Sequence, residues 1–194
     1  MKFSGKYWDE KYVLNSTGWD IGYVSTPLKE YFDQLRDKNI KILIPGAGRA
    51  WEAEYLYQNG FNNVTILDYS IEAIKEVTNR CPDFPRENIV TDDFFHHKGK
   101  YDLIIEQTFF SSLNPGQRKD YAKHVDKLLK NGGKLVGLLF NHRFEFDGPP
   151  FGGTENEYLR LFSSIFDILK MEPANNSIKP RKGRELFMLL QKRD

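Results

Sequence analysis

The stretch "IPGAGRAW" (residues 44–51) joins a short apolar run to a segment of helical character, and its two glycines decide how the chain turns there. Gly46 and Gly48 would let the backbone bend sharply and approach a ligand where a Cβ atom would collide. Ligands of open α/β sheets bind outside the carboxyl ends of the strands, and this turn follows an apolar run. Two interpretations stay open from this stretch alone: a nucleotide-binding turn, or a tight turn without a ligand.

The composition indicates one globular domain, spanning 1–194. Of the 194 residues, 40% are hydrophobic and 14% aromatic, which is enough for a sizeable core. A net charge of +1 gives no reason to expect nucleic acid or an anionic membrane as partner, and no obligate protein partner is implied. The single cysteine rules out an internal disulfide and a cysteine-based zinc site, and we expect no metal. Without a signal-peptide pattern or an apolar run of about 20 residues, a soluble cytoplasmic protein is expected.

Short apolar runs alternate with amphipathic segments along the chain. The segments predict helices over 26–39, 50–60, 70–80 and 114–133. This alternation is typical of an α/β fold, here a Rossmann-like, seven-stranded, mostly parallel sheet with helices on both faces. Only a loop separates the last two runs, so we expect them to form an antiparallel pair at the C-terminal edge. The runs predict strands at 40–44, 63–68, 88–93, 101–107, 133–140, 166–172 and 185–192.

Acidic residues at the ends of the second and third predicted strands favour a bound adenosine. Asp68 follows Gly48 by 20 residues, the spacing at which a carboxylate can bind both ribose hydroxyls. Asp93 ends the third strand, where it could meet an adenine edge. The third glycine of a dinucleotide fingerprint is replaced by Trp51, and no phosphate-binding P-loop is present. A cofactor with ribose and adenine but no phosphate fits best, and S-adenosylmethionine is such a molecule.

Four stretches together resemble one enzyme family. They are similar to the class I S-adenosylmethionine-dependent methyltransferases, within these to the thiopurine S-methyltransferase family, and nearest to its thiol, thiocyanate and halide methyltransferase branch. The aromatic first stretch and the last stretch are more specific than the glycine turn. The stretches are "YWDEKYVLNSTGWDIGYVSTPL" (7–28), "IPGAGRAWEAEYL" (44–56) with "VTILDYSIEAI" (64–74), "DFF" (93–95) with "YDLIIEQTFFSSLNPGQRKDYAKHVDKLLKNGG" (101–133), and "GPPF" (148–151).

The resemblance implies a set of cofactor contacts and an N-terminal aromatic lid over residues 1–25. Two positions depart from the family pattern. Tyr12 stands where the family often has tryptophan, and Gln107 stands where the thiopurine enzymes carry arginine and the plant thiol and halide enzymes tyrosine. The second departure argues against thiopurine itself as the substrate. The implied contacts are Trp8, Tyr12, Trp19, Gly46, Asp68, Asp93, Phe94 and Gln107, and the glycine turn itself adds Gly48 as a candidate.

The expected acceptor is a small soft nucleophile: a thiol, thiocyanate or halide. Such an anion is already nucleophilic, so the protein needs to align the reactants and exclude water rather than supply a strong base. Two alternatives stay open: methylation of an oxygen or nitrogen of a small metabolite, with His142 or Tyr23 as base, and a non-catalytic S-adenosylmethionine-binding module. The candidates for lining the acceptor pocket are Trp19, Tyr23, Phe109, Phe110, Phe151 and, for an anionic substrate, Arg181.

Overall fold

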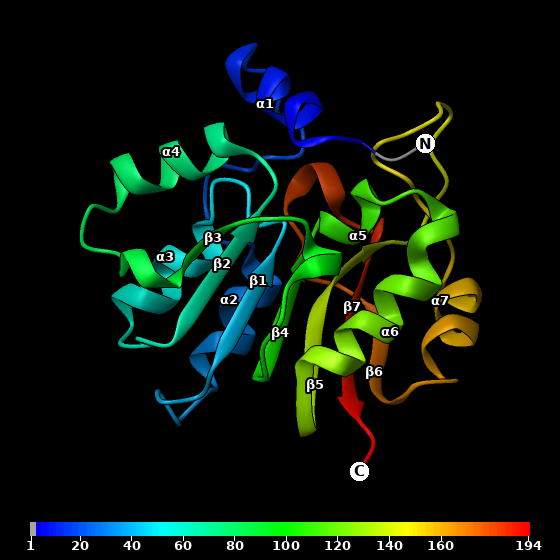
Figure 1. Ribbon diagram of the computed structural model, residues 1–194. Helices are drawn as coiled ribbons and strands as arrows, with labels where there is room; N and C mark the ends of the chain where they lie inside the picture. The colour runs from blue at the N-terminus through cyan, green and yellow to red at the C-terminus, as the bar shows by residue number, and fades with distance from the viewer. Residues whose placement is uncertain (1–2) are drawn as a thin grey trace.

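The centre of the protein is a seven-stranded sheet, seen in a computed structural model that describes residues 3–194 (Figure 1). The strand order is β3-β2-β1-β4-β5-β7-β6. Neighbouring strands among β1 to β5 pair in parallel, whereas β7 is antiparallel to both β5 and β6. The predicted mostly parallel sheet with an antiparallel C-terminal strand is confirmed. The strands are β1 (Ile42–Pro45), β2 (Val64–Asp68), β3 (Ile89–Thr91), β4 (Tyr101–Gln107), β5 (Leu129–Phe140), β6 (Phe166–Pro173) and β7 (Glu185–Lys192).

Helices cover both faces of the sheet, as the alternation of segments predicted. In β1, Ile42 and Ile44 point toward the face that is covered by α2, α3 and α4, and Leu43 between them points toward the face that is covered by α5, α6 and α7. This alternation follows from the two-residue period of a strand and makes a strand that is buried on both sides. The helices are α1 (Gly5–Val13), α2 (Thr26–Asp33), α3 (Trp51–Gln58), α4 (Ile71–Arg80), α5 (Phe109–Ser112), α6 (Arg118–Leu128) and α7 (Glu155–Phe162).

The strand order reverses between β1 and β4. After β1 the chain adds β2 and β3 on one side, and it then returns to place β4 on the other side of β1. Loops that leave β1 and β4 at their carboxyl ends therefore diverge to opposite faces and open a crevice between them. The turn at 46–50 and the connection from β4 to α5 lie at this crevice.

Two predicted helices are shorter than expected. The helix predicted over 26–39 is α2, which ends at Asp33, and the second is α6. The periodicity predicted a helix over 114–133, stopped by a glycine pair, but α6 ends at Leu128 and the chain enters β5 at Leu129. The pairing of β4 with β5 jumps from Tyr101↔Leu129 to Leu103↔Lys134, so the intervening residues bulge out of the strand. Gly132 takes a φ of +68° there, and the glycine pair thus forms a bulge rather than a helix stop.

The N-terminal aromatic stretch contains a helix, α1, that the sequence did not predict. Ser4 caps it by accepting a hydrogen bond from the backbone N–H of Tyr7 (3.3 Å). Trp8 and Tyr12 are four residues apart and so lie on one side of the helix. In Figure 1, α1 lies beyond the end of the sheet, over the crevice and beside α4. None of the helices within residues 3–194 is long and apolar enough to cross a membrane.

Candidate functional site

The glycine turn after β1 lies against the end of β2. Gly46 and Gly48 take φ values of +58° and +55°, a region that side chains disfavour. The backbone N–H of Gly48 donates to Oδ2 of Asp68 (2.7 Å), and the N–H of Ser70 donates to Oδ1 (2.8 Å). The turn and the carboxylate are thereby fixed to each other at the carboxyl ends of β1 and β2.

Asp68 combines burial with good hydrogen bonding. Its side chain faces the pocket but is almost fully buried. Burial raises the pKa of its carboxyl above the usual value, against backbone N–H groups of Ser70, Gly48 and Tyr69 that lower it. The two carboxylate oxygens together offer about four acceptor positions, so beyond these three backbone N–H groups the carboxylate can still accept a hydrogen bond from a ligand hydroxyl.

The end of β3 contributes an acidic and aromatic corner. Asp93 is buried, and its Oδ1 accepts the N–H of Phe95 (3.0 Å), which caps a short 3₁₀ turn over Phe94–His96. The ring of Phe94 packs edge-on against Phe109 (5.2 Å between centroids) and close to Tyr121 (5.5 Å). A flat group that enters this corner would meet a carboxylate at its edge and aromatic rings at its face.

Aromatic rings from the N-terminal segment (residues 3–25) form the opposite wall. Trp19 lies edge-on to both Trp8 (5.5 Å between centroids) and Tyr12 (6.0 Å). Burial and the nearby Asp68 carboxylate raise the pKa of Tyr12, so its hydroxyl stays protonated at neutral pH. Asp9 anchors α1 to the start of α4, because its Oδ1 accepts the hydroxyl of Ser70 (2.6 Å).

The connection from β4 to α5 supplies the third side of the pocket. Thr108 takes a left-handed φ of +64°, which is unusual for a residue with a branched side chain and is typical of constrained functional sites. Buried Glu106 stands beneath α5, where its carboxylate accepts the N–H of Phe110 (2.8 Å) and the hydroxyl of Tyr121 (2.9 Å). The carbonyl of Ser111 accepts the N–H of Phe151 (2.6 Å) and holds the "GPPF" loop beside α5.

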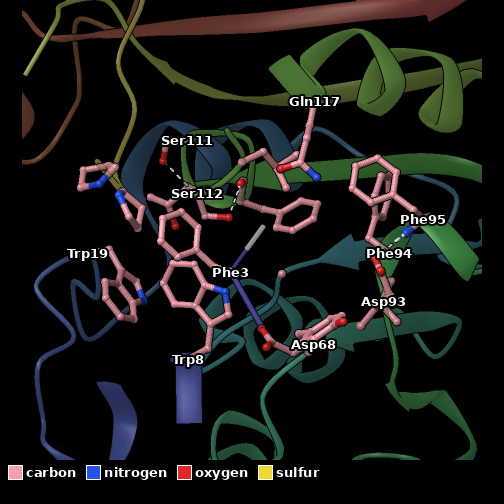
Figure 2. A pocket seen from close by; sticks show the side chains of 18 of the residues that line it. Phe3, Trp8, Trp19, Asp68, Asp93, Phe94, Phe95, Ser111, Ser112 and Gln117 are labelled. Atoms are coloured by element: carbon pink, nitrogen blue, oxygen red, sulfur yellow. Dashed lines mark hydrogen bonds between the residues drawn. The ribbon is translucent and has the colours of Figure 1, made fainter. Parts of the chain in front are cut away.

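These three sides enclose one pocket of about 970 Å³, part of which is open to solvent. Figure 2 shows the acidic corner around Asp93 on one side of the view and Trp19 with Ser111 on the other, with Asp68 and Trp8 between them. Within residues 3–194, the side chains that line this pocket include no lysine, arginine or histidine. The lining comprises Phe3, Trp8, Tyr12, Trp19, Gly46, Leu67, Asp68, Tyr69, Asp92, Asp93, Phe94, Phe95, Thr108, Phe109, Ser111, Ser112, Leu113, Gln117, Pro149 and Pro150.

The structure brings most of the predicted cofactor residues together. Gly48 does not line the pocket but holds Asp68, as described above. Gln107 lies outside the lining, and its buried Oε1 has no hydrogen-bond partner among residues 3–194. The predicted residues that line the pocket are Trp8, Tyr12, Trp19, Gly46, Asp68, Asp93 and Phe94.

The predicted acceptor residues divide differently. Trp19 and Phe109 line the pocket, whereas Phe110 points into the core (1% exposed) and Tyr23 is half exposed outside the pocket. Phe151 is not among the lining residues, and its ring lies 6.4 Å from that of Phe3, centroid to centroid. Arg181 is buried away from the lining, so its guanidinium is not placed to meet an anionic substrate in the pocket.

The partners of Arg181 explain its position. Its Nη1 donates to Glu185 Oε1 (3.3 Å) and its Nη2 to the carbonyl of Trp19 (2.5 Å). It therefore supports the pocket wall from behind.

Several lining residues were missed by the sequence analysis. Phe3 and Tyr69 carried no pattern of their own, although Tyr69 directly follows Asp68. Ser112 and Gln117 lie in the stretch "SSLNPGQ", which was recognised for its family resemblance without roles for its polar side chains. Among residues 3–194, no group of three histidine, cysteine, aspartate or glutamate side chains is arranged to hold a metal ion.

Comparison with known proteins places this geometry in a family. A model of the family "Thiopurine S-methyltransferase (TPMT)" matches residues 4–190. A probable thiol methyltransferase 2 of Arabidopsis thaliana is 28% identical over 184 residues, covering 92% of this chain and 81% of the relative. A thiopurine S-methyltransferase of Bos taurus is 26% identical, covering 87% and 79%, and a thiocyanate methyltransferase 1 of Brassica oleracea is 24% identical, covering 92% and 81%.

The fold agrees with that of solved methyltransferases. The crystal structure of 1,6-didemethyltoxoflavin-N1-methyltransferase from Burkholderia thailandensis, with bound S-adenosylhomocysteine, superposes with a TM-score of 0.77 at 18% identity, covering 98% of this chain and 87% of that one. At that identity the likeness shows the fold alone, and the family match carries the activity. The chain belongs to the thiopurine S-methyltransferase family and is an S-adenosylmethionine-dependent methyltransferase.

Proposed function

We propose that the protein transfers the methyl group of S-adenosylmethionine to a small soft nucleophile such as a thiol, thiocyanate or halide. The observation that carries this proposal is the lining of the pocket near Trp19 and Ser111. Its walls are aromatic rings, the prolines of the "GPPF" loop and serine hydroxyls, and within residues 3–194 no histidine, lysine or arginine reaches it. An acceptor that is already nucleophilic needs no base there.

The chemistry of the other residues suits an adenosyl cofactor. Asp68 can still accept a hydrogen bond from a ribose hydroxyl, and Asp93 with Phe94 forms a corner for the adenine. The glycine turn lies in close contact with two aromatic side chains of the site, because a Cβ at Gly46 would collide with Phe109 and one at Gly48 with the hydroxyl of Tyr12. When bound, S-adenosylmethionine supplies an electrophilic methyl group on a positively charged sulfur.

The chain's own contribution is alignment and exclusion of water. Trp8 and Trp19 close one side of the pocket, and Phe109 with the two prolines closes another, so the reacting atoms would meet in a space of low polarity. A transfer to an anion neutralises charge, and such surroundings favour that change.

The alternative acceptors would require a base in the same place. His142 and Tyr23, the bases considered for an oxygen or nitrogen acceptor, both lie outside the lining. Burial lowers the pKa of the His142 imidazole below its usual value. The named activities of relatives, a thiol and a thiocyanate methyltransferase, also support a soft acceptor.

A panel of acceptors tests the proposal. The purified full chain is incubated with S-adenosylmethionine and, separately, with aliphatic thiols, aromatic thiols, thiocyanate, iodide, phenols and amines, and S-adenosylhomocysteine is quantified. We expect turnover with thiols or the soft anions. Among thiols, kcat/KM should follow the ionisation of each thiol as the pH rises, because the protein adds no base of its own.

Three outcomes would contradict the proposal. Turnover of phenols or amines alone would show that a base reaches the acceptor. The same pH midpoint for every thiol, whatever its own pKa, would show a titrating group of the protein in the reaction. Binding of S-adenosylmethionine without turnover of any acceptor would favour the non-catalytic module.

A further inference from the structure

Asp20, which directly follows Trp19, connects the N-terminal segment to the glycine turn. Its Oδ1 accepts the indole N–H of Trp51 (2.8 Å) and the backbone N–H of Gly22 (3.0 Å), and its Oδ2 accepts an N–H of Arg49. The carboxylate is only 10% exposed. Burial alone would raise the pKa of Asp20, but these hydrogen bonds lower it below the usual value, so the ion pair with Arg49 is charged at neutral pH.

The turn side of this contact is braced independently. The Nε of Arg49 donates to Glu76 of α4, and its carbonyl accepts an N–H of Arg80. The guanidinium of Arg80 also lies 3.8 Å from the ring centroid of Trp51. Arg49 and Trp51 are therefore held in place whether or not Asp20 is present. Each donates one N–H group to the Asp20 carboxylate.

Trp19, the residue before Asp20, lines the pocket. Its carbonyl accepts an N–H of Arg181 (2.5 Å) from the connection between β6 and β7, and its following residue is tied to the turn. Between these two attachments, the indole ring lies against Trp8 and Tyr12 in the pocket wall. The exposed residues on either side, Leu14 and Tyr23, add little packing of their own.

We propose that Asp20 is a positioning residue, which ties the N-terminal segment to Arg49 and Trp51 and thereby holds Trp19 at the wall of the pocket. The stretch 46–51 then has two tasks. Its glycine backbone shapes the floor of the pocket, and its two large side chains hold the segment that covers it. The effect on methyl transfer rests on the proposed function, whereas the anchoring itself does not.

Matched substitutions separate anchoring from stability of the turn. Asp20→Ala removes every contact of the carboxylate, Asp20→Asn keeps an oxygen for Trp51 and Gly22 but loses the charge, and Glu76→Gln weakens the other carboxylate partner of Arg49 without touching the N-terminal segment. Hydrogen–deuterium exchange of peptides covering 14–25 is measured on the ligand-free full chain. Affinity for S-adenosylhomocysteine is measured by calorimetry, and kcat and KM with an accepted thiol.

We expect a graded result. Asp20→Ala should raise exchange in 14–25 and weaken S-adenosylhomocysteine binding by about tenfold or more, since a charge-assisted, mostly buried contact is lost. Asp20→Asn should fall between it and the wild type. Glu76→Gln should lower the melting temperature but keep exchange in 14–25 and affinity within about twofold of the wild type, because the Asp20 contacts remain.

Three results decide the matter. Wild-type exchange in 14–25 for Asp20→Ala would overturn the proposal. If the alanine variant fails to fold, wild-type exchange in 14–25 for Asp20→Asn would overturn it instead. Equal losses of affinity in Glu76→Gln and Asp20→Ala would also overturn it, since Arg49 would then act only by stabilising the turn. If the wild type binds no S-adenosylhomocysteine, the proposed function fails, and the exchange data of the ligand-free chain still decide the anchoring.

Discussion

The substitution Gly46→Ala probes the floor of the pocket most directly. Gly46 has a φ of +58°, and a Cβ at this position would lie 2.3 Å from Cδ2 and 2.6 Å from Cγ of Phe109. Real Cβ atoms essentially never approach another heavy atom closer than 3.0 Å, so either the ring or the turn must move. The substitution therefore combines backbone strain with a collision in the binding site.

Gly60→Ala is the matched control for the strain. Gly60 follows α3 with a φ of +86°, and a Cβ there would meet nothing within 4 Å. Placing alanine in the left-handed region costs roughly 1–2 kcal/mol at either position. At Gly46, displacing Phe109 from its contacts with Phe94 and Tyr121 adds about 1–3 kcal/mol, the usual cost of overpacking.

Urea unfolding measures the loss of stability, and calorimetry with S-adenosylhomocysteine measures the loss of affinity. Gly60→Ala should lose roughly 1–2 kcal/mol of unfolding free energy and keep its affinity. Gly46→Ala should lose about 2–5 kcal/mol and bind about tenfold or more weakly, because the turn and the Phe109 ring both line the pocket. Equal stability of the two variants, with unchanged affinity in Gly46→Ala, would refute the close approach of Phe109 to the turn.

Two further substitutions test the support of the site. Burial raises the pKa of Glu106 from 4.5 to about 7, so its stabilisation is complete below the unfolded-state pKa and is lost as the pH rises through the folded-state pKa. Glu106→Gln cannot ionise, and between pH 5 and pH 8 its unfolding free energy should fall about 2–3 kcal/mol less than that of the wild type, measured by urea unfolding; parallel profiles would contradict this. Arg118 donates from Nη2 to the carbonyls of Phe151 (3.2 Å) and Gly152 (2.9 Å), so Arg118→Lys should speed hydrogen exchange in 148–153 and raise the KM of the acceptor while the cofactor affinity stays unchanged. The exposed Arg160→Lys is its control, and an equal response of both would count against a specific role of Arg118.

The main features of the sheet could be predicted because they depend on local patterns. Short apolar runs, several of them apolar on both faces, placed all seven strands, and the short connection before β7 implied an antiparallel pair. The insertion of β7 between β5 and β6 could not be read from the chain, because a short loop fixes which strands pair and not which other neighbour each finds. The length of α6 was overestimated because a glycine pair serves a helix end and a strand bulge equally well.

Site residues whose place depends on the backbone turn could be predicted from the sequence. Residues whose place depends on the direction of the side chain were harder to predict. Gly46 and Asp68 follow from the spacing of turn and strand end. Phe109 and Phe110 are adjacent in sequence, yet one lines the pocket and the other fills the core, and no pattern in a four-residue helix separates them. Arg181 was predicted as a contact for an anionic substrate from its charge alone. In the structure it pairs with Glu185, the first residue of β7. The sequence did not show this pair, because it depends on how the turn before β7 folds back onto the strand.

Trp51 argues against a dinucleotide cofactor and also binds the Asp20 carboxylate beside the pocket. Its bulk argued against a pyrophosphate, because close approach of the α3 N-terminus to phosphates needs a small side chain there. In the structure the indole N–H is occupied by Asp20 and the ring by Arg80, so the start of α3 is covered by protein. A cofactor without phosphates does not compete for that helix end. The chain is therefore free to use it as the attachment of the segment that carries Trp19, and a variant that restored a glycine at this position would lose the attachment without gaining a phosphate site, since Asp20 and Glu76 would still place negative charge beside it.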